Sequence, residues 1–365
     1  MPQIKSVKDA DVAGKRVLVR VDLDVLEGTA VIDMRLRAAV PTLQLLHDRG
    51  AVQIVIVGYV GRPGGKVVEA LRVAPVAKRL QELAPGINFE VKENLRFDPR
   101  EEANDKGFAK ELATLGDIFV NESFATAHRA YASIVGIPKF LPSFAGLRFE
   151  EEMRRLTLAL TPPHGALAVI GGVKFETKVP LIKKLLGLYA EVLLGGALAN
   201  DIIKARGLPF GSSLLSDTPV PEDIASDDRL LIPDDAIFAE TGSNAERSGR
   251  VVDIRAEESV IDIGPATSKR WAEKISKAPF VLWNGPMGIY EQGYRDGTDI
   301  LAAELVRSGI PAVVGGGDTA AAVSKFSFNP EKVFISTGGG AMLQFLADGT
   351  LPAIEALKTS KSDLR

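Results

Sequence analysis

The sequence of 365 residues contains no cysteine, and this absence excludes disulfide bonds, thiolate nucleophiles and cysteine-ligated zinc sites. It also lacks any apolar run long enough to form a membrane-spanning helix. The N-terminal segment MPQIKSVKDADVAGK has no apolar core of the kind found in signal peptides. These absences lead us to expect a cytoplasmic protein with no membrane partner.

Charge of one sign does not dominate the chain. The 44 lysines and arginines nearly balance the 47 aspartates and glutamates, and the net charge of −3 argues against a nucleic-acid partner. The hydrophobic content of 46% and the charged content of 25% are typical of globular proteins. A chain of this length exceeds one ordinary hydrophobic core, so we expect two domains.

Several familiar nucleotide-binding patterns are also missing. The sequence has neither a P-loop (GxxxxGK[ST]) nor a GxGxxG dinucleotide fingerprint, and it lacks the protein-kinase motifs. No His, Asp and Glu residues cluster with the spacing of metal ligands. Any Mg²⁺ is therefore expected to enter the protein on a nucleotide.

The first half of the chain alternates apolar, β-branched runs with segments of helical periodicity. Strands are expected at residues 16–22, 53–57, 88–92 and 117–121, and helices at 37–48, 74–83 and 104–115. Such alternation predicts an α/β fold with a parallel sheet that helices cover on both faces.

The same pattern restarts after a break. Residues 144–160 predict a long charged helix, and the TPPHG segment at 161–165 is typical of an interdomain connector. Strands are expected beyond it at 166–170, 191–194, 229–232, 280–283, 312–314 and 332–336, whereas 253–267 is expected to be irregular. The predicted domains are residues 1–150 and 151–349.

Glycine-rich or polar loops follow most of these strands, and ligands of open α/β sheets bind beyond the carboxyl ends of strands. The most distinctive loop is PAVVGGGDT at 311–319, which reads as a strand, a glycine turn and a helix start. Its free N–H groups suit a phosphate, and Asp318 or Thr319 could offer an oxygen to a metal-bound phosphate. The alternative is a tight turn in which Asp318 or Thr319 caps the helix.

Four arginines lie at or near strand ends and loops of the first half: Arg35, Arg62, Arg96 and Arg129. A guanidinium group keeps its charge and matches phosphate or carboxylate oxygens, so together they suggest a site for an anionic small molecule. Each arginine taken alone is more typical of a solvated surface residue, and only the four together point to a site. His128 could add a donor or a proton, or be a partly buried histidine. Asp22 and Asp24 could orient hydroxyls or arginines, or serve a turn.

Three charged residues stand out in the glycine loops of the second half. Lys174 lies in a loop, and Lys178 lies near the start of a helix whose first turn contains Pro180. A lysine there opposes the helix dipole, and a bound polyphosphate would offset this penalty. Glu291 could accept hydrogen bonds from a ribose or be an ordinary surface carboxylate.

These features together describe an anion-binding first domain and a glycine-lined, phosphate-binding second domain. Phosphoryl transfer depends on charge neutralisation, in-line positioning and exclusion of water more than on a covalent catalyst. Direct phosphoryl transfer on closure of the two domains fits this layout.

Motifs along nearly the whole chain resemble those of the phosphoglycerate kinase family, in the family's order: RVDLDV, VGRP, ENLRF, VNESFATAHRA, GGVKFETK, DIGPAT, WNGPMGIYE, GGGDT and STGGGA. The resemblance implies two Rossmann-like domains joined by a long helix and hinge, with residues 350–365 packing on the first domain. It implies a monomeric enzyme of glycolysis that transfers a phosphoryl group reversibly between 1,3-bisphosphoglycerate and MgADP, giving 3-phosphoglycerate and MgATP.

The resemblance also implies roles for individual residues. The first domain would bind phosphoglycerate and the second the nucleotide. Arg35 and Lys178 would be catalytic, and Asp318 would lie near the Mg²⁺ ion. The substrate-binding residues would be Asp22, Asp24, Arg35, Tyr59, Arg62, Arg96, His128 and Arg129. The nucleotide-binding residues would be Lys174, Lys178, Gly195, Gly196, Asn284, Glu291, Gly316, Gly317, Asp318 and Thr319.

Five positions depart from the family pattern. Asp24 stands where the family usually has Asn, Tyr59 where it has His and Gly58 where it has Ser, while Glu122 and Ala125 replace Asp and Gly. Asp24 adds negative charge beside an anionic substrate, and Tyr59 cannot be cationic near neutral pH. We therefore expect an active kinase with weakened phosphoglycerate binding. A binding protein without turnover and a kinase for another carboxylic acid stay open as alternatives.

Overall fold

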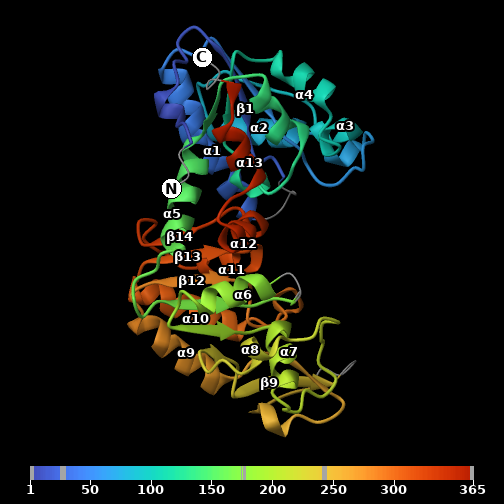
Figure 1. Cartoon of the computed structure of the whole chain (residues 1–365), viewed down its shortest axis with the longest axis vertical. Helices are drawn as coiled ribbons and strands as arrows, with labels where there is room; N and C mark the ends of the chain where they lie inside the picture. Colours follow the sequence, from blue (N-terminus) through green and yellow to red (C-terminus); the bar gives the residue numbers. More distant parts are fainter. Residues whose placement is uncertain (1–3, 25–29, 174, 176–177, 241–244, 362–365) are drawn as a thin grey trace. The chain divides into compact units, whose positions relative to one another are not determined.

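The computed structural model describes residues 4–24, 30–173, 175, 178–240 and 245–361. The chain forms two compact units, of which the first comprises Met1–Thr157 with Gly340–Arg365 and the second comprises Leu158–Gly339. A parallel sheet flanked by helices forms the centre of each unit (Figure 1), which confirms the predicted α/β class. None of the helices in the described ranges combines the length and apolar character needed to cross a bilayer.

The first unit is built on a five-stranded parallel sheet with the order β3-β2-β1-β4-β5. Its strands are β1 (Arg16–Arg20), β2 (Gln53–Val57), β3 (Glu90–Val91), β4 (Ile118–Asn121) and β5 (Ser143–Ala145). The chain starts at the centre, winds to one side and then continues on the other, so the winding reverses between β1 and β4. Ligands of such sheets bind at this reversal, beyond the carboxyl ends of the strands.

Helices bury both faces of this sheet. Along β1, Val17 and Val19 lie in one hydrophobic core with Leu43 of α1, whereas Leu18 lies in a second core with Phe108 of α4. This alternation follows from the two-residue period of a strand, and it explains why β1 is apolar throughout. The helices are α1 (Ala30–Asp48), α2 (Ala74–Leu83), α3 (Pro99–Glu102), α4 (Lys106–Ala113), α5 (Leu147–Ala159), α12 (Gly339–Asp348) and α13 (Pro352–Lys358). Short helical turns are η1 (Val7–Asp9), η2 (Glu69–Leu71), η3 (Leu95–Phe97), η4 (Phe124–Thr126), η5 (Ala132–Gly136) and η6 (Ile137–Lys139).

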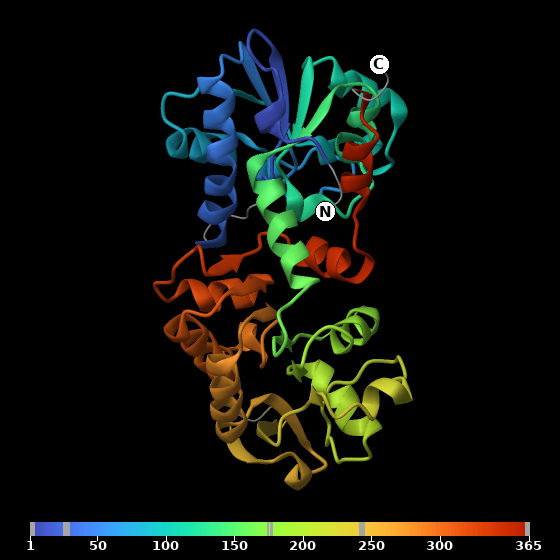
Figure 2. The same cartoon turned by 60° about the vertical axis from the view of Figure 1, so that its left-hand side comes forward.

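The C-terminal segment belongs to the first unit, where α13, coloured red in Figure 2, packs against η5 and β5. The Ala353 N–H donates a hydrogen bond to the Ala127 carbonyl at 3.0 Å. Phe345 of α12 packs edge-on against Phe124, with ring centroids 6.4 Å apart. The C-terminal segment is therefore anchored to the segment that follows β4.

The second unit contains a six-stranded parallel sheet with the order β14-β13-β12-β6-β7-β8, which reverses its winding between β6 and β12. Its strands are β6 (Leu167–Ile170), β7 (Glu191–Leu194), β8 (Leu230–Leu231), β12 (Val281–Asn284), β13 (Ala312–Gly315) and β14 (Val333–Ile335). Its helices are α6 (Val179–Leu186), α7 (Ala197–Ala205), α8 (Glu222–Ala225), α9 (Pro265–Lys277), α10 (Asp296–Ser308) and α11 (Gly317–Ser324), with the turns η7 (Val251–Asp253) and η8 (Tyr290–Gln292).

A separate antiparallel sheet corrects the expectation of an irregular segment at 253–267. Strand β9 (Asp235–Glu240) pairs with β10 (Glu246–Arg250) on one side and with β11 (Glu258–Ile263) on the other. The sequence of β10, ERSGR, has no apolar alternation, so periodicity cannot reveal it. Tertiary packing stabilises it instead, because the Arg247 guanidinium lies 4.7 Å from the ring centroid of the buried Phe238.

Other boundaries differ from the sequence-based expectations. The helix expected from residue 144 begins at Leu147, because Ser143–Ala145 forms the edge strand β5. Phe144 is buried in the sheet core, and an apolar residue at this place fits either periodicity. The helix expected from residue 37 already begins at Ala30, and the strand expected at 88–92 shortens to β3. The strand at 53–57 and the helix at 74–83 are confirmed as predicted.

Replacing Gly146 by alanine is expected to destabilise the first unit by about 2 kcal/mol or more. A Cβ atom at Gly146 would overlap the carboxylate of Glu122, which is itself buried and accepts the Arg148 N–H at 3.1 Å. Gly317→Ala is the matched control, because it has open space and an ordinary backbone conformation. Equal midpoints of denaturant unfolding for the two variants would contradict this account.

Candidate functional site

The predicted anion-binding residues of the first unit follow its strands at their carboxyl ends. Asp22 and Asp24 follow β1, Arg62 follows β2, and Arg96 lies in η3 after β3. Because all five strands are parallel, these segments leave the sheet at the same edge. His128 and Arg129 follow β4 and leave it there as well.

Arg35 of α1 connects this helix to the segment after β1. Its Nε lies 3.5 Å from Asp22 Oδ2, and its Nη1 donates to the Asp24 carbonyl at 2.7 Å. Burial raises the pKa of Asp22, although Arg35 and Arg20 oppose this effect. The geometry supports the prediction that an aspartate after β1 orients an arginine.

Gly61 is held from both sides. Its N–H donates to Asp24 Oδ1 at 2.8 Å, and its carbonyl accepts from Arg96 Nη1 at 2.7 Å. Its φ of 63° lies in the left-handed region, which a glycine adopts without strain. The next residue, Arg62, is exposed. Asp24 therefore uses its carboxylate to place the turn that carries Arg62.

Arg96 is 4% exposed and lies against two tyrosine rings. Its Cζ is 3.6 Å from the ring centroid of Tyr59 and 5.3 Å from that of Tyr131. Its Nη2 donates to the Tyr131 hydroxyl at 2.9 Å, and its Nε lies 2.9 Å from Glu102 Oε1. Sequence reasoning missed Tyr131 and Glu102, because nothing in their spacing relates them to Arg96.

The segment after β4 supplies a neutral imidazole and a cation. Burial, together with the neighbouring Arg129, lowers the pKa of His128 to about 4, so His128 is neutral at pH 7. The Nε of Arg129 is buried and has no hydrogen-bond acceptor among the residues that the structure describes. His128 can thus act as a donor but brings no charge to an anion.

Backbone turns of the second unit pack directly on one another at the carboxyl edge of its sheet. A Cβ atom at Gly171 would overlap the Pro286 carbonyl, and one at Gly285 would overlap the carbonyl of Gly171. A Cβ atom at Gly195 would lie 2.6 Å from Met287 Sδ, and one at Gly196 would lie 2.7 Å from the nitrogen of Gly172. These glycines are therefore required for contacts between loops.

The glycine turn before α11, unlike the turns just described, has open space beside it. Gly316 has a φ of 96°, and Gly317 has no atom within 4 Å of the place where a Cβ would lie. Thr319 is buried, and its hydroxyl accepts the Gly285 N–H at 3.0 Å. The N-terminus of α11 thus has open space beside Gly317, while Thr319 ties the turn to β12, whose last residue is the buried Asn284.

Asp318 and Glu291 place two carboxylates near this turn. Both are exposed, and Glu291 lies in η8. Partial burial and the negative charge of Glu291 raise the pKa of Asp318, against the effect of Arg295. A cation would relieve this repulsion, so Asp318 suits a metal ion. Among the described residues, no group of three or more His, Asp or Glu side chains could hold a metal by itself.

Lys178 directly precedes α6 and is 8% exposed. Its Nζ donates to the Gly171 carbonyl, next to the turn of Gly171 and Gly172. Burial lowers the pKa of Lys178 to about 8. Pro180 occupies the first turn of α6, as predicted. Lys174, the other predicted lysine, lies outside the described residues.

Asp262 is a further buried carboxylate whose place sequence reasoning treated only as a turn. Its oxygens accept the N–H groups of Ile263 at 2.8 Å and Gly297 at 3.0 Å. Burial raises its pKa to about 7. Gly297 opens α10 and follows the segment that carries Glu291, so Asp262 positions this segment.

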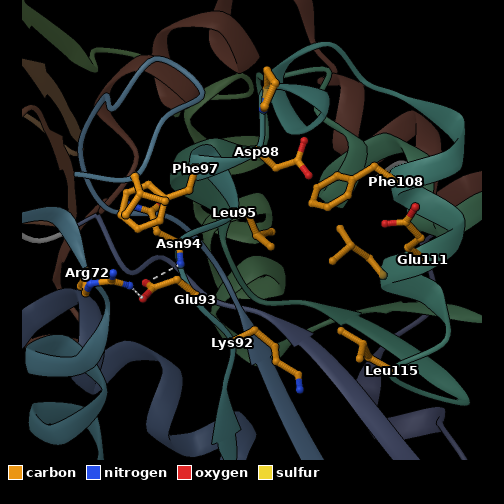
Figure 3. A pocket seen from close by; sticks show the side chains of 13 residues that line it. Arg72, Lys92, Glu93, Asn94, Leu95, Phe97, Asp98, Phe108, Glu111 and Leu115 are labelled. Atoms are coloured by element: carbon orange, nitrogen blue, oxygen red, sulfur yellow. Dashed lines mark hydrogen bonds and ion pairs between the residues drawn. The ribbon is translucent and has the colours of Figure 1, made fainter. Parts of the chain in front are cut away.

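A cavity of about 640 Å³ lies elsewhere in the first unit (Figure 3). Leu95, Phe97 and Phe108 contribute to its walls, and two of its charged residues, Arg72 and Glu93, form an ion pair at 2.9 Å. None of the predicted binding residues lines it. The candidate site therefore lies at the sheet edges and not in this cavity.

Replacing Lys178 by methionine is expected to raise the free energy of unfolding at pH 7 by on the order of 1–3 kcal/mol. A lysine whose pKa falls from 10.5 in the unfolded chain to about 8 disfavours the folded state below pH 8. This penalty shrinks between pH 8 and 10.5 and vanishes above, so the variant's advantage should shrink likewise. Chemical unfolding at pH 7 and pH 10 measures it, and a less stable variant at pH 7 would refute the argument.

Comparisons with known proteins agree on one family. The family model described as phosphoglycerate kinase matches residues 7–349. The phosphoglycerate kinase of Roseiflexus sp. (strain RS-1) is 41% identical over 391 aligned positions, which cover 97% of this chain and 98% of that protein. The phosphoglycerate kinase of Chloroflexus aggregans is 40% identical over 402 positions, covering 98% and 99%.

A solved structure shows the same architecture. The phosphoglycerate kinase from Coxiella burnetii superimposes with a TM-score of 0.83 at 33% sequence identity, over 97% of this chain and 99% of that one. Sequence and fold therefore point to the same family along almost the entire chain.

Proposed function

Because the chain belongs to the phosphoglycerate kinase family, we propose that its two units divide the substrates of that reaction between them. The chain is a phosphotransferase with a carboxyl group as acceptor. It transfers a phosphoryl group reversibly between 1,3-bisphosphoglycerate and ADP, giving 3-phosphoglycerate and ATP, a step of glycolysis. We further propose a cytoplasmic monomer with no nucleic-acid partner.

The first unit is proposed to bind phosphoglycerate. The observation that carries this proposal is that the segments with Arg62, Arg96 and Arg129 all leave a parallel sheet at one edge, at which its winding reverses. Arg62 is exposed, and the Nε of Arg129 has no acceptor among the described residues, so both have donors for an anion. The proposed substrate-binding residues are Asp22, Asp24, Arg35, Tyr59, Arg62, Arg96, His128 and Arg129.

The second unit is proposed to bind the nucleotide at the reversal between β6 and β12. The open N-terminus of α11 suits a phosphate, because its first N–H groups and the positive end of the helix dipole attract anions. The proposed nucleotide-binding residues are Lys174, Lys178, Gly195, Gly196, Asn284, Glu291, Gly316, Gly317, Asp318 and Thr319. Asp318 would hold a Mg²⁺ ion that arrives with the nucleotide and neutralises part of the phosphate charge.

Lys178 and Arg35 are the proposed catalytic residues. No covalent intermediate is needed, since phosphoryl transfer depends on placing the reacting groups and compensating their charge. The pKa of Lys178 is about 8 without substrate, and nearby phosphate groups should raise it and keep the ammonium charged. Lys178 would then stabilise negative charge on the migrating group, with Arg35 contributing from the phosphoglycerate side.

A coupled assay with 3-phosphoglycerate and MgATP tests this function. The native enzyme should turn over, and Lys178→Met should lose about 100-fold or more in kcat, because it removes a charge that acts on the transferred group. Lys183→Met is the matched control, since Lys183 lies on α6, which Lys178 directly precedes, but is exposed and paired with Asp223.

Two outcomes would contradict the assignment. Binding of both ligands in calorimetry without turnover would identify a binding protein of the same fold. Turnover of MgATP with a different carboxylic acid, and none with 3-phosphoglycerate, would identify another acceptor.

Asp24→Asn is expected to lower the KM for 3-phosphoglycerate by about 2- to 10-fold and to leave the KM for MgATP unchanged. The asparagine oxygen can still accept the Gly61 N–H, whereas the negative charge beside an anionic substrate disappears. Steady-state kinetics of both substrates measures the effect. An unchanged or higher KM for 3-phosphoglycerate would refute the explanation of this departure from the family pattern.

A further inference from the structure

We propose that Tyr59 and Tyr131 form an aromatic clamp that positions Arg96, and through Arg96 the turn of Gly61 and Arg62, for phosphoglycerate binding. The inference rests on the proposed function of the first unit. It assigns both tyrosines as positioning residues, and it gives Tyr59 a role other than contact between its hydroxyl and the substrate.

The ring of Tyr59 lies near two cations. It is 5% exposed, with the Cζ atom of Arg96 at 3.6 Å and that of Arg20 at 5.0 Å from its centroid. Arg20 is fully buried at the end of β1, where its Nε donates to Ser133 at 3.1 Å. The negative face of an aromatic ring attracts guanidinium groups, so the ring stabilises two buried cations that would otherwise repel each other.

Tyr131 fixes the same guanidinium group by its hydroxyl. The hydroxyl accepts from Arg96 Nη2 at 2.9 Å and donates to Glu102 Oε1 at 3.1 Å. Glu102 Oε1 in turn lies 2.9 Å from Arg96 Nε, which closes a ring of three side chains. The rings of Tyr59 and Tyr131 lie 6.3 Å apart at 60°, so the two parts of the clamp also pack together.

The clamp acts on the binding residues through Gly61. Arg96 Nη1 donates to the Gly61 carbonyl at 2.7 Å, while the Gly61 N–H is held by Asp24. A guanidinium group that lost one of these contacts would be held less rigidly, which would weaken its hydrogen bond to the Gly61 carbonyl. Arg62 follows Gly61 directly, so its backbone would lose this anchor.

The tyrosine at position 59 bears on how the clamp works. Tyr59 is one of the departures from the family pattern, where a histidine usually stands. A tyrosine keeps a neutral aromatic face at all physiological pH values, and burial raises its pKa further. It can therefore attract Arg96 over a wide pH range, whereas a protonated histidine would repel it.

Kinetics of three variants tests the clamp. Tyr59→Leu removes the ring and should raise the KM for 3-phosphoglycerate about 3- to 30-fold, with kcat and the KM for MgATP within about 2-fold. Tyr59→Phe keeps the ring and should recover most of the lost affinity. Tyr131→Phe removes only the hydroxyl and should raise the same KM about 2- to 10-fold.

Tyr189→Phe is the matched control. The Tyr189 hydroxyl donates to the Ala159 carbonyl at 2.7 Å in the second unit, so its loss should lower stability and leave both KM values unchanged. If Tyr59→Leu does not fold, the clamp is tested by the KM for 3-phosphoglycerate of Tyr131→Phe compared with that of Tyr189→Phe. A KM for 3-phosphoglycerate that stays at the native value in Tyr131→Phe and Tyr59→Leu would overturn the clamp.

The test separates the clamp from the proposed function. An active native enzyme with unaffected variants refutes the clamp alone. A native enzyme without turnover refutes the proposed function. The clamp is then tested by calorimetry with 3-phosphoglycerate as the probe, where equal affinities of the native chain and Tyr59→Leu refute it. A larger loss of affinity in Tyr59→Phe than in Tyr131→Phe would assign the substrate contact to the Tyr59 hydroxyl and also overturn it.

Discussion

Parallel pairing of strands is the constraint on which the arrangement of both units depends. When all strands of a sheet run the same way, every segment that follows a strand leaves at the same edge. Residues far apart in the chain, such as Asp24, Gly61 and Arg96, then meet in direct hydrogen bonds. Helices on both faces keep the strands buried, so side-chain chemistry is confined to the loops at that edge.

Both units contain buried side chains whose charged form is disfavoured by the loss of water. Burial lowers the pKa of Lys178, whose Nζ donates to the Gly171 carbonyl. Burial likewise raises the pKa of Asp22, which lies beside Arg35. Arg96 is compensated by Glu102 and by two aromatic rings. Such groups reduce the stability of a folded chain unless ligands or partners offset the burial, and groups with perturbed pKa values cluster at functional sites of proteins in general.

Predictability from sequence differs between the fold and the site. The α/β class and strands such as β2 followed from apolar runs and their spacing, which reflect local physics. Strand β10 could not be predicted, because its polar residues carry no periodic signal and its pairing with β9 comes from tertiary packing. Motif resemblance singled out Asp24, Tyr59 and Arg96 as candidate binding residues. It did not reveal that Asp24 accepts the N–H of Gly61 while Arg96 donates to the carbonyl of the same residue, or that Tyr131 also contacts Arg96.

The amino-acid sequence alone determined three things: the family, the alternation of strands and helices, and the types of side chain that follow each strand. All three depend on local spacing and on the residues that make up the motifs. Only the tertiary structure decided which of these side chains touch. Burial, distance and the orientation of hydrogen bonds arise from residues brought together across the sheet. That is why the neutral state of His128, the lowered pKa of Lys178 and the packing of Arg96 against two tyrosine rings became visible only in the fold.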